Sequence, residues 1–160
     1  MPSVYDIAYS SKSNVTITLA SLADSSGRQS TGVDNSTTKY VDVLVSGFIT
    51  TGAAPTTDST FSIYAFGSAN AGGTYSDGAT GTDGAWTNGD NAKLIAVIQT
   101  DNSATTAYEF GPYSIAAPFG GHVPEFWGIG IENNTGDALD STGSNHEIHY
   151  VGINYNEETV

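Results

Sequence analysis

The sequence of 160 residues contains no cysteine, which excludes disulfide scaffolds, thiol catalysis and cysteine-ligated zinc. Charged residues are scarce as well: 13% are Asp, Glu, Lys or Arg, against about a quarter in an average globular domain. Only four residues are Lys or Arg, whereas 17 are Asp or Glu, so the formal net charge is -13. Such a surface repels phosphate backbones and anionic lipids, so we expect no direct binding to nucleic acid or to a membrane.

Long hydrophobic runs are also missing. No apolar stretch approaches the roughly 18 residues of a membrane-spanning helix, and residues 1–13 have neither the basic start nor the apolar core of a signal peptide. We therefore expect synthesis and folding in a cytoplasm. The length corresponds to a single domain, which is large enough to bury a core without covalent cross-links. No internal repeat and no break in composition divides the chain.

Turn-forming residues are abundant and scattered, with 19 Gly among many Ser, Thr, Asn and Asp. Between them lie short runs rich in Val, Ile, Phe and Tyr, several of which alternate with a period of two. This pattern predicts an all-β, single-domain sandwich or barrel of about eight strands with little or no helix. The predicted strands cover 14–19, 40–49, 61–67, a short segment near Tyr75 or Trp86, 93–98, 107–115, 125–133 and 147–155.

The remaining segments are expected outside the strands. Residues 1–13 form an N-terminal arm, 14–156 the β-sandwich domain, and 157–160 an acidic tail exposed to solvent. Residues 20–38 consist mostly of turn-forming residues, so no strand is predicted there. Pro112 cannot donate a ladder hydrogen bond, which places the strand containing it at a sheet edge or breaks it.

No arrangement of residues indicates a metal site or a catalytic centre. Three acids between Asp77 and Asp90 resemble a calcium loop only loosely, because their spacing is wrong and no closing Glu follows, so solvated turns are favoured. His146 and His149 are three residues apart and would face opposite sides of a strand. His122 has no serine or acid pattern beside it in the sequence. No pair among the 17 acids is marked for glycoside hydrolysis.

Three further residues are candidates for interactions. Arg28, the sole arginine, is expected to clamp a loop through an intrachain carboxylate, with contact to a neighbouring subunit as the alternative. Tyr75 and Trp86 lie in a Gly-rich stretch, where exposed aromatic rings would suit glycan stacking or a protein interface. The alternative for Trp86 is that it folds back as a plug.

The scarcity of lysine also bears on assembly. All-β proteins usually protect open sheet edges with lysine, and this sequence has only three. We therefore expect another chain to cover some edge or face of the protein.

Several segments, taken in order, resemble a group of small structural proteins of tailed bacteriophages. They are GRQSTGVDNSTTKYVDVLV at 27–45, IYAFGSANAGGTYSDGATGTDGAW at 63–86 and GPYSIAAPFGGHVPEFWGIGIENNTGDAL at 111–139. The resemblance implies a β-sandwich of jelly-roll type, often trimeric, attached to the outside of the capsid as a cement or decoration protein. It implies no catalytic residue and no cofactor.

The expected function is therefore non-enzymatic reinforcement of a phage capsid from its outer surface, after synthesis in the host cytoplasm. The expected partners are the major capsid protein and further copies of the chain, with a trimer favoured. A carbohydrate-binding or fibre-type adhesion module on the virion is the alternative, and a small glycan-cleaving enzyme is a third hypothesis. The candidate interaction residues are Met1, Pro2, Val4, Tyr5, Ile7 and Tyr9 of the arm, with Arg28, Tyr75 and Trp86.

Overall fold

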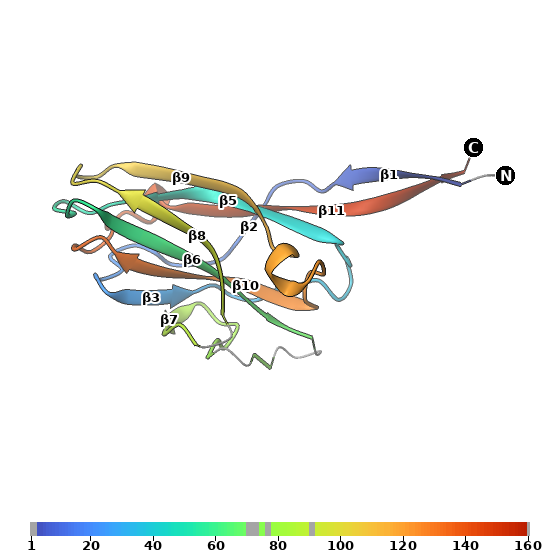
Figure 1. Cartoon of the computed structure of the whole chain (residues 1–160), viewed down its shortest axis with the longest axis horizontal. Helices are drawn as coiled ribbons and strands as arrows, with labels where there is room; N and C mark the ends of the chain where they lie inside the picture. Colours follow the sequence, from blue (N-terminus) through green and yellow to red (C-terminus); the bar gives the residue numbers. More distant parts are fainter. Residues whose placement is uncertain (1–2, 70–73, 76–77, 90–91, 160) are drawn as a thin grey trace.

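The chain folds into a β-sandwich of two antiparallel sheets (Figure 1), as its alternating hydrophobic pattern predicts. The computed structural model describes residues 3–69, 74–75, 78–89 and 92–159. One sheet has the order β1-β11-β5-β9, with β2 also paired to β11, and the other has the order β7-β3-β10-β6-β8, with β4 also paired to β10. The strands are β1 (Ser3–Tyr9), β2 (Ser13–Asn14), β3 (Ser26–Gln29), β4 (Val33–Asp34), β5 (Asp42–Thr50), β6 (Ser59–Ser68), β7 (Gly84–Trp86), β8 (Lys93–Thr100), β9 (Ala107–Ser114), β10 (Phe126–Asn134) and β11 (Glu147–Thr159).

Helical structure in the described part of the chain is limited to two single turns, η1 (Ala117–Phe119) and η2 (Gly143–Asn145). Among the described residues, no helix has the length and the apolar character that crossing a membrane requires.

The core lies between the two sheets and is built by alternation along the central strands. On β5 the side chains of Val43, Val45 and Ile49 are fully buried, and β10 contributes Trp127, Ile129 and Ile131 in the same way. Residues two apart on a strand point to the same face, so each strand turns its β-branched and aromatic residues inward. The intervening residues of β5, among them Ser46, therefore lie on the outer face of the five-stranded sheet.

Residues 14–19, predicted as a strand, are different in the structure. Ladder pairing ends at Asn14, although Val15 and Leu19 are buried as the alternation predicts. The reason is that this segment leaves the five-stranded sheet for the six-stranded one: the Val15 amide still donates to Ile148, whereas Thr16 already accepts from Thr31. The side chains alternate as in a strand, but the backbone has no single neighbour to pair with.

Residues 20–38, expected to contain no strand, hold β3 and β4. Both are short and pair with β10. Their polar sequences have little strand preference, and β10 provides the backbone hydrogen bonds that make them strands. The short strand expected near Tyr75 or Trp86 is β7, which ends at Trp86. Pro112 lies in β9, an edge strand of the five-stranded sheet, as predicted.

The two ends of the chain also depart from expectation. The N-terminal arm contains β1, and residues 157–159, expected as a solvated tail, continue β11 and pair with β1. The two segments become strands because each provides backbone hydrogen-bond partners for the other.

Candidate functional site

A two-stranded ribbon projects from the sandwich (Figure 1). β1 pairs with the distal part of β11, in a register that runs from Tyr9 opposite Ile153 to Ser3 opposite Thr159. The pairing of β5 with β11 stops at Ile153, so from residue 154 to residue 159 β11 pairs only with β1 among the described strands. At about 3.4 Å per residue, these six residues extend roughly 20 Å.

One face of this ribbon carries large apolar and aromatic side chains. Tyr5, Ile7 and Tyr9 are two residues apart and therefore share a face; they are 66%, 60% and 65% exposed. Tyr155 lies directly opposite Ile7 on the neighbouring strand, and it is 58% exposed. These four residues are called the ribbon face below. An exposed cluster of this composition is typical of a surface that another protein covers.

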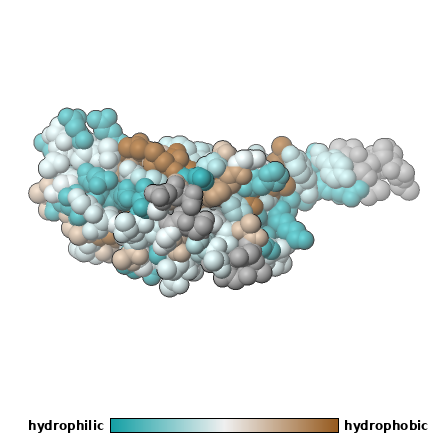
Figure 2. Space-filling view, turned by 60° about the horizontal axis from the view of Figure 1, so that its bottom comes forward, coloured by the Kyte–Doolittle hydropathy of each residue, from teal (hydrophilic) through white to brown (hydrophobic). Residues whose placement is uncertain are grey.

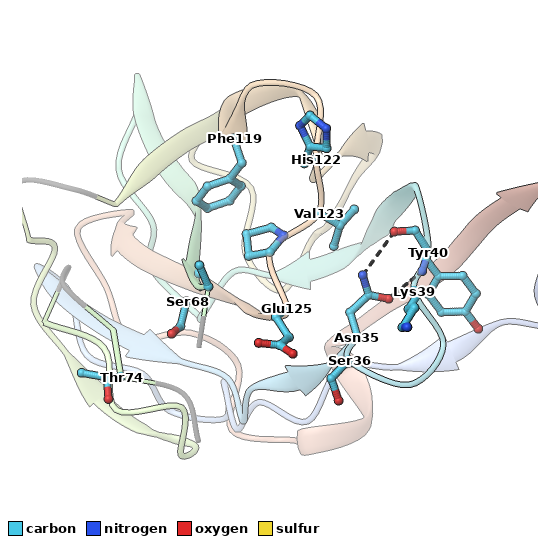
Figure 3. A pocket seen from close by; sticks show the side chains of 13 residues that line it. Asn35, Ser36, Lys39, Tyr40, Ser68, Thr74, Phe119, His122, Val123 and Glu125 are labelled. Carbon is cyan, nitrogen blue, oxygen red and sulfur yellow. Dashed lines mark hydrogen bonds between the residues drawn. The ribbon is translucent and has the colours of Figure 1, made fainter. Parts of the chain in front are cut away.

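A pocket of about 780 Å³ lies where the ribbon leaves the body. Its walls come from the β4–β5 turn, the end of β6 and the loop between η1 and β10 (Figure 3). The turn is fastened to the base of the ribbon, because the Tyr40 ring occupies the space above Gly152 and Asn154 donates to the Thr38 carbonyl. The lining residues are Asn35, Ser36, Lys39, Tyr40, Gly67, Ser68, Ala69, Thr74, Phe119, His122, Val123, Pro124 and Glu125.

The pocket is held open by a buried asparagine. The Asn35 side chain accepts from the Tyr40 amide at 2.8 Å and donates to the Tyr40 carbonyl at 3.2 Å (Figure 3), which fixes the turn in place. Phe119 and Val123 give the hollow an apolar side, and Lys39, His122 and Glu125 add charged or polar groups. Within the described residues, His122 forms no hydrogen bond or ion pair with a serine or a carboxylate. The combination of an apolar side with a few polar groups is typical of a binding pocket.

Arg28 forms the intrachain clamp that the sequence favours, although it lies in a strand rather than in a loop. Its Nε donates to Oδ1 of Asp83 at 2.8 Å, and the same carboxylate accepts from the amide and the hydroxyl of Thr18 at 3.1 and 2.6 Å. Burial raises the pKa of Asp83, but the hydrogen bonds from Arg28 and Thr18 lower it by more, so that it lies below its usual value. The three residues join the segment 14–19, strand β3 and the loop before β7.

The expected aromatic stacking platforms are not exposed. Trp86 is only 5% exposed and packs edge-on against Tyr64 with a centroid distance of 5.5 Å. Its ring lies over Gly130, where a Cβ would approach it to 2.3 Å. Tyr75 is half-buried and packs edge-on against Phe66. Trp86 therefore folds back as a plug, as the alternative expectation had it, and it has no exposed face on which a glycan could stack.

The other candidate residues belong to the N-terminal arm and to the calcium-like stretch. Met1, Pro2, Asp77 and Asp90 lie outside the described residues, and Val4 belongs to β1. The middle acid of the calcium-like stretch, Asp83, is engaged by Arg28, and the described residues contain no group of three potential metal ligands.

The two C-terminal histidines contact different groups. The ring of His146 lies between the Thr50 amide and the Asp140 carbonyl, at 3.3 and 2.9 Å. That of His149 lies beside Ser46. The contact between Ser46 and His149 was missed by the sequence analysis, and so was the role of Tyr155 in the ribbon face, although the alternation of Ile153 and Tyr155 was a usable signal.

Comparisons with known proteins give no relative for this chain: no family model, no curated protein and no solved structure matches it. Its function is therefore inferred from its sequence, geometry and chemistry.

Proposed function

We propose that this protein is a structural component of a tailed-bacteriophage virion, a cement or decoration protein that binds the outer face of the capsid through protein–protein contacts, a role that needs no catalysis. The observation that carries the proposal is the projecting ribbon with its exposed apolar face. A ribbon of two strands gains little stability from itself, so large apolar side chains at its surface indicate a partner that buries them.

The strand order supports this proposal. β1, β2, β5, β9 and β11 form one sheet, while β3, β6, β8 and β10 form the core of the other, and the chain passes repeatedly from one sheet to the other. This strand order fits the proposed jelly-roll type, with short additions at β4 and β7. Jelly rolls are common in viral shells, although the same architecture also serves lectins and cupins.

The ribbon face offers enough surface for a specific contact. Complete burial of a side chain of this size contributes about 1.5–3 kcal/mol, and each of the four residues is still about two-thirds exposed. Covering the ribbon face would therefore contribute several kcal/mol, before the cost of association is subtracted. The proposed partners are the major capsid protein and a neighbouring copy of the chain in a homo-oligomer, with a trimer favoured.

A second exposed apolar surface fits assembly as well. β8 is an edge strand of the six-stranded sheet, and its residues Leu94 and Val97 are 54% and 53% exposed. Figure 2 shows hydrophobic side chains gathered in a patch on the body, away from the ribbon. An apolar edge strand is a template for another chain unless something covers it. The charge of -13 favours a location on the outside of the shell, away from packaged DNA.

The pocket beside the ribbon favours a second candidate function, that of a carbohydrate-binding or fibre-type adhesion module. Its apolar wall at Phe119 and the charged groups of Lys39 and Glu125 are the groups that a sugar would contact. This alternative no longer uses Trp86 or Tyr75. Binding on a glycan array that is lost in Phe119→Ala would favour it over the cement function.

The decisive experiment changes the ribbon face and leaves the opposite face as its control. The test variant carries Tyr5→Ser, Ile7→Ser and Tyr9→Ser, and the control carries Asp6→Ser and Ala8→Ser on the same strand. Both are mixed with empty phage shells stripped of the protein, and bound copies per shell are counted after sedimentation. We expect the test variant to bind at least tenfold more weakly and the control to bind normally. Undiminished binding of the test variant, or of a chain lacking residues 1–13, refutes the proposed role of the ribbon.

A further inference from the structure

The outer face of the five-stranded sheet holds a second hollow, of about 640 Å³, which shares no lining residue with the pocket in Figure 3. Ionisable and nucleophilic side chains gather in it from three strands and the N-terminal arm. They include Lys12, Ser46, Glu109, Glu147 and His149. Nothing in the proposed cement function requires this arrangement.

Strand register brings three of these residues into line. Ser46 of β5 and His149 of β11 are direct cross-strand partners, so their side chains stand side by side on the outer face. Glu147 precedes His149 by two residues and shares its face. The Oγ of Ser46 lies 3.1 Å from Nε2 of His149, and Nδ1 of the same ring lies 3.2 Å from Oε1 of Glu147. A hydroxyl, an imidazole and a carboxylate in this order form the arrangement that activates a serine nucleophile.

The backbone around Ser46 is irregular on the side of β9. Val45 pairs with Tyr113 and Gly47 with Phe110, so Ser46 faces two residues of β9, Gly111 and Pro112, and the bulge lies in β9. Gly111 has a φ of +87°, and a Cβ there would lie 2.8 Å from the Cα of Ser46. Bulges of this kind re-aim a side chain and are frequent beside functional sites. Here the bulge brings the Gly111 backbone close to Ser46 on one side, while the pairing of Ser46 with His149 on the other side is regular.

One ring nitrogen of His149 has no hydrogen-bond partner of good geometry in the described part of the chain. This nitrogen, Nδ1, is buried, and Glu147 contacts it by distance alone. Catalytic hydrogen bonds are often long or poorly aligned before substrate binds. Glu147 also contacts Lys12, whose hydrogen bond lowers the pKa of the carboxyl group. The carboxylate is therefore ionised at neutral pH and is placed to stabilise the positive charge that the ring would acquire on taking a proton.

We propose that this hollow is a nucleophilic site that cleaves small carboxylic esters, with Ser46 as nucleophile, His149 as general base and Glu147 as the residue that positions the ring. His149 Nε2 takes the proton of Ser46 as Oγ bonds to the ester carbonyl carbon. The carbon–oxygen bond to the alcohol then breaks, and the alcohol leaves with that proton. Water, deprotonated by the same nitrogen, attacks the acyl-serine, which releases the carboxylic acid and restores Ser46. Lys12 supplies positive charge beside the hollow for the oxyanion.

The test uses the full chain with two probes, a fluorophosphonate that bonds to activated serines and p-nitrophenyl acetate as the ester. We expect a single phosphonate adduct, located by mass spectrometry on Ser46, and ester hydrolysis that falls about 100-fold in Ser46→Ala and in His149→Gln. Glu147→Gln should lower hydrolysis about tenfold and alter its pH profile between about pH 5 and 8, which a purely structural role of Glu147 would not do.

Exposed histidines also hydrolyse this ester slowly, so His122→Gln is the matched control and should keep the parent rate. Urea unfolding of each variant identifies any loss that is due to misfolding. The proposal is overturned if folded Ser46→Ala retains the parent rate, if His122→Gln and His149→Gln lose activity equally, or if no adduct forms on Ser46. Binding to phage shells, measured on the same Ser46→Ala protein, keeps this result separate from the cement function.

Discussion

The clamp between Arg28 and Asp83 should be the largest single electrostatic contribution to stability in the described structure. Asp83 accepts three hydrogen bonds, from Arg28 and twice from Thr18, and the paired side chains are only 29% and 18% exposed. Hydrogen bonds to charged groups contribute about 1.5–3 kcal/mol, and removing one partner leaves the other half-buried charge unpaired. We therefore expect Asp83→Ala to lower the free energy of unfolding by about 2–3 kcal/mol at pH 7.

The effect should depend on pH in a defined direction. The pKa of Asp83 is lower in the folded protein than its usual value of 3.8, so the unfolded chain binds the proton more tightly. The carboxylate therefore stabilises the fold fully above pH 5 or so, and this contribution disappears as the pH falls through the folded-state pKa. The difference between the parent and Asp83→Ala should be constant from about pH 5 to pH 8 and should shrink below about pH 4.

Urea unfolding followed by tryptophan fluorescence measures this difference at each pH. Glu109→Gln removes one negative charge from an exposed position on β9 and is the control for net charge; we expect little change. The reasoning fails if Asp83→Ala unfolds at the same urea concentration as the parent at pH 7. It also fails if the difference is as large at pH 3 as at pH 7, because the stabilising carboxylate would then not be its source.

Two further predictions concern the core. Trp127 is fully buried between the sheets, so Trp127→Ala should cost about 3–5 kcal/mol in urea unfolding; a loss below 1 kcal/mol would mean that the sandwich is not packed around it. At Gly130 a Cβ would lie 2.3 Å from the Trp86 ring, so Gly130→Ala should displace that ring, cost about 1–3 kcal/mol and shift the tryptophan emission to longer wavelength. An unchanged emission maximum would show that Trp86 does not rest on Gly130.

The central strands were predictable because their signal is local. In β5 and β6 buried and half-buried positions alternate over eight and seven residues, and β-branched or aromatic residues occupy most of the buried ones, which is the pattern of a half-buried strand. Edge placement of β9 followed from Pro112 in the same way. β3 was not predictable, because Ser26, Gly27 and Arg28 have low strand preference and pair only since β10 lies beside them.

In the candidate sites, too, local features were predictable and contacts between distant residues were not. The arm was expected to carry interaction residues, and Tyr5, Ile7 and Tyr9 are exposed on it. That it forms a ribbon with the C-terminus depends on residues about 150 positions away, which no local pattern encodes. The expectation of an exposed Trp86 was wrong, because the Gly-rich stretch around it does not show that Gly130, on another strand, makes room for its ring.

The amino-acid sequence by itself determined an all-β chain without disulfides, its strongly acidic surface and the inward residues of its longest strands, since each depends on composition or on the period of two along one strand. Only the tertiary structure decided that the chain ends form a projecting ribbon and that Ser46 meets His149, 103 positions away. Contacts of this kind depend on strand order and register, and a shift of one residue in register would turn every side chain of a strand to its other face.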